Sequence, residues 1–347
     1  MPFPFEGLKN MSAQAQQVLL EVQDLHKHYP IKGGLWGGRL GHIEAVAGVS
    51  FSILAGQTLG LVGESGCGKS TLGRTLMRLE EPTKGLVRFE GQDVGSAKGR
   101  VLMQLRRDIQ MVFQDPYSSL NPRMTVGDIV REPLLVHRLG SRSEQIERVC
   151  SLLAKVGLSA DVMSRYPSEF SGGQRQRVGV ARALALGPKL VIADEPVSAL
   201  DVSVQSQVLN LMVDLQRELG LSYLFISHDL SVVQHVSDVV AIMYLGRMVE
   251  LGPVERIFNH PAHPYTRALL QAIPSGNPRQ RQRVAPLAGE APSQTERAQG
   301  CVFAKRCPHA IDACRQAEPE HTVLTAPAQT SAQAHWVACI RHADLAL

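Results

Sequence analysis

In the first part of the chain, hydrophobic and polar residues alternate with a period of two. Between residues 18 and 56 the alternation is clearest at Val49, Phe51 and Ile53, and glycine-rich turns interrupt it. Such alternation is typical of antiparallel strands that bury one face. The pattern therefore predicts a small antiparallel β subdomain near the N-terminus.

The pattern then changes to short, fully apolar strands separated by helices. The run QTLGLVG leads into a glycine-rich turn, and leucines at helical spacing predict a helix from Ser70 to Leu79. Two β-branched runs, KLVIADE and SYLFISH, flank a helical stretch at 202–219, and residues 239–245 form another apolar run. This alternation predicts a parallel sheet with crossover helices.

Two further stretches depart from this pattern. Residues 100–180 are dominated by helical periodicity and predict a helical subdomain. Residues 274–300 are rich in Pro, Gly, Arg and Gln and have almost no large apolar side chains, which is typical of a linker. We therefore expect a main domain at 1–255, a connecting segment at 256–300 and an extension at 301–347.

Composition limits the classes of protein that remain possible. The 347 residues are 44% hydrophobic and 20% charged, and the formal net charge of +4 is too small to argue for nucleic-acid binding. No apolar run approaches the roughly 18 residues that cross a bilayer, and the N-terminus lacks the pattern of a secretory signal. We expect a cytosolic chain whose contact with any membrane is peripheral.

The glycine-rich turn carries the clearest chemistry. It matches the phosphate-binding pattern GxxxxGK[ST] and continues into the next helix with Thr71; the residues are Gly63, Glu64, Ser65, Gly66, Cys67, Gly68, Lys69 and Ser70. Its amides can curl around a phosphate, Lys69 supplies a cation, and the Ser70 hydroxyl suits Mg²⁺. A glycine turn alone is common, but the strand before it and the helix after it favour a nucleotide site.

A pair of carboxylates follows a second apolar strand. Asp194 and Glu195 come directly after the run LVIA, at the carboxyl end of the strand, where ligands of open α/β sheets bind. Asp194 suits the Mg²⁺ site, and Glu195 suits polarising the water that attacks the γ phosphate. A strand that ends in DE is a weak signal alone, but it becomes strong beside the phosphate loop.

The motif SGGQ lies between the phosphate loop and the carboxylate pair, at the start of a predicted helix that carries arginines, and it is typical of one family. With Ser171, Gly172, Gly173 and Gln174 in place, the chain resembles the ABC ATPases. The resemblance implies an α/β P-loop NTPase fold with a RecA-like core, an antiparallel β subdomain and a helical subdomain. It also implies that ATP and Mg²⁺ are held between the phosphate loop of one subunit and the SGGQ helix of another.

Other positions match the same family one by one. The resemblance implies that Gln114 senses Mg²⁺ and water and that His228 contacts the γ phosphate. It also implies that Asp201, in the run SALD, belongs to the loop at the subunit interface, and that Tyr29 stacks on adenine. Phe170 before SGGQ and Cys67 in the phosphate loop depart from common family choices, and neither touches the required chemistry.

Longer phrases narrow the resemblance to the ATPases of dipeptide and oligopeptide importers. They include FQDPYSSLNPR, SGGQRQRVGVARAL, DEPVSALDVSVQ, MYLGRMVE and HPYT. The resemblance implies a peripheral subunit on the cytoplasmic face of the inner membrane. It would work with a paralogous ATPase, two permeases touching residues 116–132, and an external substrate-binding protein. An importer of another substrate, such as nickel, is the alternative.

Four of the six cysteines cluster at the C-terminal end, at Cys301, Cys307, Cys314 and Cys339. In a reducing compartment such clusters indicate metal or redox chemistry more than disulfides. Four thiolates suit an iron–sulfur cluster or a tetrahedral zinc, where a histidine such as His309 or His335 can replace one cysteine. A tail without metal is the third possibility.

The resemblance to peptide-importer ATPases implies a 4Fe-4S cluster in this extension. Lys305 and Arg306 are then expected to offset its negative charge. Because the extension is far in sequence from the ATP site, we expect its cluster to fold the tail and leave the nucleotide site untouched.

Other ABC-type classes fit less well. Chromosome-organising ATPases insert long coiled coils between the two nucleotide motifs, and no sustained heptads occur here. Soluble translation factors join two cassettes in one chain, whereas this chain has one SGGQ motif. An exporter is disfavoured because the tail resembles that of importers and no membrane spans are fused to the chain.

Overall fold

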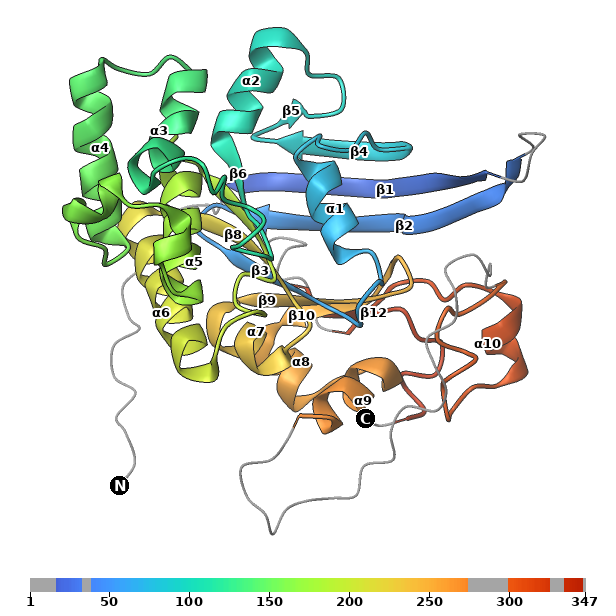
Figure 1. Ribbon diagram of the computed structural model, residues 1–347. Helices are drawn as coiled ribbons and strands as arrows, with labels where there is room; N and C mark the ends of the chain where they lie inside the picture. Colours follow the sequence, from blue (N-terminus) through green and yellow to red (C-terminus); the bar gives the residue numbers. More distant parts are fainter. Residues whose placement is uncertain (1–16, 33–38, 274–298, 325–333, 346–347) are drawn as a thin grey trace, which may run out of the picture.

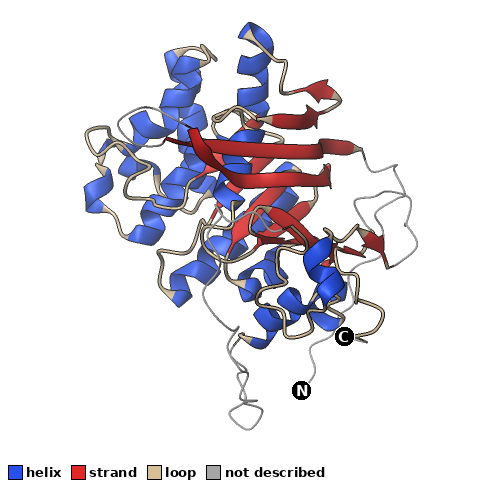
Figure 2. Ribbon diagram, turned by 90° about the vertical axis from the view of Figure 1, so that its right-hand side faces the viewer, coloured by secondary structure: helices blue, strands red, loops and turns tan. Residues whose placement is uncertain are grey.

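The computed structural model describes residues 17–32, 39–273, 299–324 and 334–345. Figure 1 shows two sheets, a group of helices beside them and a C-terminal extension at one edge. Figure 2 shows the strands gathered in the interior with helices around them. Among the described residues, no helix has the length and apolar character needed to cross a bilayer.

The first sheet is antiparallel, as the period of two predicts. Its order is β2-β1-β4-β5, and its strands are β1 (Val18–Lys32), β2 (Arg39–Leu54), β4 (Lys84–Phe89) and β5 (Gln92–Asp93). Val22 pairs with Phe51 on β2 and with Val87 on β4, so apolar side chains of three strands lie side by side on the buried face.

The second sheet has a parallel centre with an antiparallel edge. Five strands run parallel in the order β9-β3-β8-β7-β6, and β10, β12 and β11 continue the sheet antiparallel beyond β9. The strands are β3 (Thr58–Val62), β6 (Ile109–Val112), β7 (Leu190–Asp194), β8 (Ser222–Ser227), β9 (Val239–Tyr244), β10 (Arg247–Pro253), β11 (Thr322–Val323) and β12 (Trp336–Val337). The central strands are apolar on both faces because helices and the first sheet cover them.

The helices connect these strands and build a separate layer on one side. Helix α1 contacts both sheets, whereas α3 packs on α4 and α5. The helices are α1 (Lys69–Leu76), α2 (Gly99–Asp108), α3 (Val126–Val136), α4 (Arg142–Lys155), α5 (Gly172–Leu184), α6 (Val202–Leu219), α7 (Leu230–Val236), α8 (Val254–Asn259), α9 (Pro264–Gln271) and α10 (Asp312–Gln316), with 3₁₀ turns η1 (Ala160–Ser164) and η2 (Pro167–Glu169).

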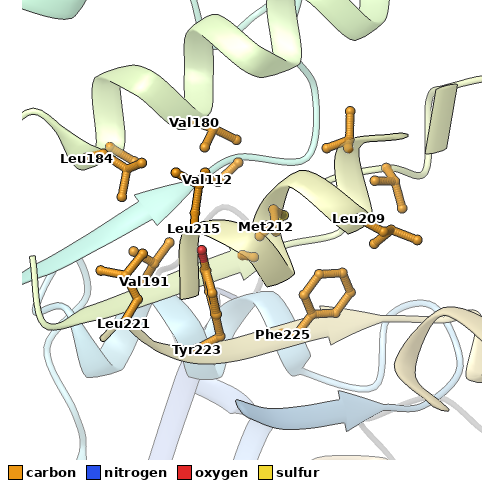
Figure 3. Packing of buried hydrophobic residues seen from close by; sticks show 14 of the residues in the cluster. Val112, Val180, Leu184, Val191, Leu209, Met212, Leu215, Leu221, Tyr223 and Phe225 are labelled. Carbon is orange, nitrogen blue, oxygen red and sulfur yellow. The ribbon is translucent and has the colours of Figure 1, made fainter. Parts of the chain in front are cut away.

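The core joins α6 to the parallel strands. Leu209, Met212 and Leu215 recur at helical spacing and face Tyr223 and Phe225 of β8 (Figure 3). Each fully buried side chain of this size contributes about 1.5–3 kcal/mol of transfer free energy. This packing holds the carboxyl ends of β7 and β8 in a fixed register, and both strand ends carry site residues.

The sequence predicts most of these elements, but some boundaries differ. Strand β6 (Ile109–Val112) of the central sheet lies within residues 100–180, which the sequence predicts to be a helical subdomain. Helix α6 spans 202–219 and β9 occupies the apolar run at 239–245, as expected. The helix after the phosphate loop is predicted to reach Leu79 but ends at Leu76. Arg78 adopts a left-handed φ of 52°, which an α-helix cannot continue through, so Leu79 lies outside the helix and is exposed.

Candidate nucleotide site

The phosphate loop folds tightly because two of its glycines have no room for a side chain. A Cβ on Gly68 would lie 2.0 Å from the Ala45 carbonyl oxygen, and one on Gly63 would lie 2.2 Å from that of Met243. Gly68 also has φ 109° as the N-cap of α1. Only glycine permits this approach, so the loop is pressed between the two sheets with the N-terminus of α1 at its end.

Lys69 lies under the loop and holds it curled. Its side chain is buried, and Nζ donates to the carbonyl oxygens of Gly63 at 2.7 Å and Glu64 at 3.0 Å. These bonds satisfy a buried cation and close the loop on itself. Cys67 is also buried, and burial raises the pKa of its thiol, so it is a neutral packing group.

Ser70 and Asp194 bring two hard oxygen ligands together. The Ser70 hydroxyl donates to Asp194 Oδ1 at 2.8 Å, which links the start of α1 to the end of β7. Burial raises the pKa of Asp194, although the Ser70 hydrogen bond and the positive charges of Arg74 and Lys69 oppose the shift. Hydroxyl and carboxylate oxygens are the protein ligands that Mg²⁺ prefers.

Glu195 joins the ends of three neighbouring strands. Its carboxylate oxygen Oε2 accepts from Gln114 Nε2 at 3.0 Å and lies 3.1 Å from His228 Nδ1. Its backbone N–H donates to the Ile226 carbonyl at 2.9 Å, and its φ is 45°. Residues following β6, β7 and β8 thus meet at one carboxylate, which has a strained backbone.

These groups open into one pocket of about 340 Å³. Its lining combines the phosphate loop with the Glu195 group: Ala45, Ser65, Gly66, Gly68, Lys69, Ser70, Thr71, Gln114, Glu195 and His228. A larger pocket of about 650 Å³ lies among the helices α3 to α6 and contains none of the predicted nucleotide residues. The smaller pocket is therefore the one with the chemistry of a phosphate site.

Six predicted residues besides the SGGQ motif do not line this pocket: Gly63, Glu64, Cys67, Asp194, Tyr29 and Asp201. Tyr29 lies on β1, where its hydroxyl donates to the Glu80 carboxylate and Lys27 Nζ lies 4.9 Å from the ring centre. Asp201 is the N-cap residue of α6 and makes no side-chain capping bond. Neither is among the residues that line the pocket, so their assigned roles stay predictions.

The SGGQ residues also lie outside the pocket of their own chain. Ser171 caps α5 by accepting from the Gln174 amide, and the Gln174 side chain accepts from the Ser171 amide in return. A Cβ on Gly173 would lie 2.3 Å from Val204 of α6, so glycine is needed for this packing. The result is a rigid, capped helix N-terminus suited to an anion that comes from elsewhere.

The four C-terminal cysteines converge on one small cavity of about 20 Å³, which all four line. None forms a disulfide. Burial raises the pKa of the Cys301 thiol to about 11 and also raises the pKa of Cys307 and Cys339. Four cysteine sulfur atoms that line one cavity are the donor set of a soft metal site.

Sequence reasoning missed a contact between this extension and the phosphate loop. Arg306 is expected beside the cysteines as a counter-charge, but its guanidinium pairs with the carboxylate of Glu64, with Nη1 2.8 Å from Oε2. Tyr265 of the HPYT run also touches Glu64, whose amide donates to its hydroxyl at 3.1 Å. The extension, which is far from the phosphate loop in sequence, therefore contacts it in space. No local signal predicts an ion pair 242 residues apart in sequence.

Comparison with known proteins agrees with this geometry. Residues 46–198 match the family model for ABC transporters, and residues 249–314 match the C-terminal region of oligopeptide/dipeptide transporters. Among solved structures, cbiO1 from Clostridium perfringens, part of the ABC transporter complex cbiONQ, has a TM-score of 0.61 at 28% identity. The match covers 71% of this chain and 92% of that one. The ATP-binding cassette MJ0796, in a dimeric structure bound to ADP and Pi, has a TM-score of 0.60 at 28% identity. That match covers 68% of this chain and 99% of the cassette.

The curated relatives match over almost their full length. The oligopeptide transport ATP-binding protein AppF of Bacillus subtilis is 51% identical over 95% of this chain and 99% of its own. The dipeptide transport ATP-binding protein DppF of Escherichia coli is 53% identical over 90% and 93%. The chain therefore belongs to the ATP-binding subunits of ABC transporters, as an ATPase of the oligopeptide and dipeptide transport family.

Proposed function

We propose that this ATPase drives the import of dipeptides or oligopeptides, with Glu195 as the residue that polarises the attacking water. The main support for this assignment is that Gln114 and His228 both contact the Glu195 carboxylate and that all three residues line the phosphate pocket. Peptide as cargo is supported by the relatives named for oligopeptide and dipeptide transport. Their names give no support to nickel as the cargo.

The chemistry divides between two groups of residues. Lys69 and the loop amides bind the β and γ phosphates, and Mg²⁺, when bound by Ser70, Gln114 and Asp194, supplies charge neutralisation on those phosphates. Glu195 orients and polarises water, while His228 and Gln114 hold the carboxylate in place from both sides. The acceleration then comes from positioning and electrostatics, as in other phosphoryl transfers.

A second subunit is needed to complete the site. The N-terminus of α5, with its glycines and its N-cap Ser171, does not line the pocket of its own chain. We therefore propose a dimer with a paralogous ATPase. The SGGQ helix of this chain faces the ATP bound by the paralogue, and the SGGQ helix of the paralogue faces the ATP bound by this chain. Two permeases, an external substrate-binding protein and attachment to the cytoplasmic face of the inner membrane complete the proposed transporter.

The segment at 116–132 is our candidate for permease contact. Tyr117 is 61% exposed, and the guanidinium of Arg175 stacks on its ring at 4.0 Å. Arg182 Nη1 donates to the Ser119 carbonyl at 2.5 Å. Both arginines belong to α5, so a partner pressing on this surface would act directly on the signature helix.

The cysteine-rich extension is proposed to hold a 4Fe-4S cluster. All four thiols line one cavity, and four cysteine thiolates are the ligand set that such clusters use. Iron and acid-labile sulfide near four each per chain, after anaerobic purification, is the expected result; zinc alone contradicts it.

The functional assignment is tested in the assembled transporter in vesicles. Glu195→Gln is expected to retain ATP binding and to lose nearly all hydrolysis and peptide uptake, whereas Lys69→Ala loses binding itself. Glu255→Gln, on the exposed surface of α8, is the control. Near-normal turnover of Glu195→Gln overturns its role. Uptake of Ni²⁺ but not of dipeptide overturns the cargo while leaving the ATPase intact.

A further inference from the structure

Arg306 connects the cysteine-rich extension to the phosphate loop. Its Nη1 lies 3.1 Å and 2.8 Å from the two carboxylate oxygens of Glu64 and donates to the Tyr244 hydroxyl at 3.3 Å. The Arg306 side chain is 8% exposed and the Glu64 side chain 27% exposed, so this ion pair is partly shielded from water. A partly shielded, charge-assisted pair of this kind is stronger than one on the open surface.

Aromatic packing makes the contact rigid. Phe303 is fully buried and packs edge-on against Tyr244, with ring centres 5.3 Å apart, and equally close to Tyr265. Tyr265 accepts the amide N–H of Glu64, and the carbonyl of Glu64 accepts from Lys69. The side chain, amide and carbonyl of Glu64 therefore all have partners. The partner of its side chain, Arg306, belongs to the extension.

Glu64 places a negative charge inside a loop that binds polyphosphate. An unpaired carboxylate there would repel the ligand, because the effective dielectric constant near a protein surface screens it only in part. Arg306 neutralises this charge. We propose that Arg306 is a positioning residue for ATP binding, which holds and neutralises Glu64, and that its neighbour Cys307 makes this grip depend on the state of the cysteine cluster. The inference rests on the proposed nucleotide site.

The charge argument makes a specific prediction for nucleotide affinity. In the full chain as purified, Arg306→Met is expected to raise the Kd for a fluorescent ATP analogue about tenfold. Arg306→Lys keeps the positive charge, so its Kd should lie between those of the wild type and Arg306→Met. Adding Glu64→Gln to Arg306→Met removes the repelling charge and should restore most of the affinity. Lys305→Met, at the adjacent exposed position, is the matched control.

The outcomes separate three cases. If the wild-type chain fails to bind nucleotide, the proposed function falls. If it binds and Arg306→Met binds equally well, only the role of Arg306 falls. If Arg306→Met and the double variant are equally weak, the residue is merely structural and the charge argument is overturned. In the assembled transporter, the loss should appear in KM for ATP with kcat nearly kept, because Glu195, Gln114 and His228 follow other strands than Glu64 does.

The link to the cysteines has its own test. Cys307→Ser is expected to weaken nucleotide binding in the wild-type background and to have little further effect when Glu64→Gln and Arg306→Met are already present. Such non-additivity is the signature of two residues acting through one contact. Full additivity, or unchanged affinity in Cys307→Ser, overturns the coupling. Metal content of each variant, measured in parallel, reports whether Cys307→Ser has changed the cluster.

A second, independent observation concerns the outer sheet. The possible metal-ligand atoms of His28, His42 and Glu44 all lie within 4.8 Å of one another. In the β1–β2 register His28 pairs with Glu44 and Pro30 pairs with His42, so all three side chains lie on one face. The rings of His28 and His42 stack at 4.6 Å, and His42 Nε2 lies 3.1 Å from Glu44 Oε1.

We propose that these three residues form a zinc site that joins β1 to β2. Two imidazoles and one carboxylate are a frequent zinc ligand set, with water as the fourth ligand. The paired strands already hold the donors near one another, so binding requires rotation of side chains only. Tyr29 lies between His28 and Pro30 and points to the opposite face, so the metal would not contact it.

Zinc titration of the full chain with its cysteine site already loaded tests this proposal. One further equivalent should bind to the wild-type chain and be lost in His42→Gln. Zinc should also raise the melting temperature of the wild-type chain but not of this variant. His235→Gln, at an exposed histidine of α7 whose Nε2 lies 3.1 Å from Asn210 Oδ1, is the control. An identical zinc stoichiometry in wild type and His42→Gln overturns the site.

Discussion

The conformation of Glu195 shows how the site stores strain. Its φ of 45° is left-handed, which costs an L-residue about 1–2 kcal/mol. The conformation follows from the end of β7, where the chain must leave the sheet while its amide still pairs with Ile226 of β8. The turn directs the carboxylate toward Gln114 and His228. Strain held in place by surrounding contacts is typical of a functional residue.

This strain can be measured with a pair of substitutions. Glu195→Ala and Glu195→Gly both lose the bonds to Gln114 and His228, but only glycine adopts the left-handed conformation without cost. Glu195→Gly is therefore expected to be more stable than Glu195→Ala by about 1 kcal/mol in urea unfolding. Both variants should lack hydrolysis. Equal stability, or alanine the more stable, would show that the backbone at this position is relaxed.

At the scale of elements, the sequence predicts what is periodic and misses what is short. Helix α6 and strands β3, β7 and β8 have apolar patterns long enough to identify. Strand β12 has only two residues, Trp336 and Val337, and no pattern marks it; yet it pairs with β10 and extends the core sheet. The phosphate-loop residues were found because their chemistry is local in sequence, whereas Arg306 and Glu64 meet only through the fold.

The junction between β10 and the extension depends on one buried carboxyl group. Glu250 is fully buried and accepts from His335 Nε2 at 2.8 Å and from the amides of Ala262 and His263 at 2.8 and 2.9 Å. These bonds join β10, the start of α9 and the segment before β12. Polar groups buried in this way are stabilising only while every donor keeps its acceptor.

Glu250→Leu is therefore expected to destabilise the protein severely, by about 3–5 kcal/mol, because three buried donors lose their acceptor at once. Glu250→Gln keeps one oxygen and should cost less. Glu255→Ala, at an exposed position, should stay within about 0.5 kcal/mol of wild type. Chemical unfolding of the four proteins gives the comparison. A small effect of Glu250→Leu would mean that these donors find other partners.

At the scale of the whole molecule, one face carries the proposed ATP site and one edge carries the extension that contacts its phosphate loop. Residues of the phosphate loop, Ser70 of the proposed Mg²⁺ pair and Glu195 line the pocket, but none of Ser171–Gln174 does. Helix α5, which begins with SGGQ, has its own contacts: Ser171 caps it, Gly173 packs on Val204 of α6, and Arg182 donates to the Ser119 carbonyl. This arrangement supports the proposal that the pocket and the SGGQ helix are each used with a second molecule.

Hydrolysis should consequently depend on association, while binding should not. For the purified chain alone, we expect a nucleotide Kd that is independent of protein concentration and an ATPase rate per chain that rises with concentration or on adding the proposed paralogous partner. Ser171→Arg blocks the helix N-terminus with bulk and should abolish this stimulation without changing the Kd of its own pocket, because Ser171 does not line that pocket. Ser168→Arg, on an exposed neighbouring turn, controls for added charge. An ATPase rate per chain that stays constant on dilution and does not change when the partner is added would mean that one chain hydrolyses ATP alone. That result would overturn the two-subunit site.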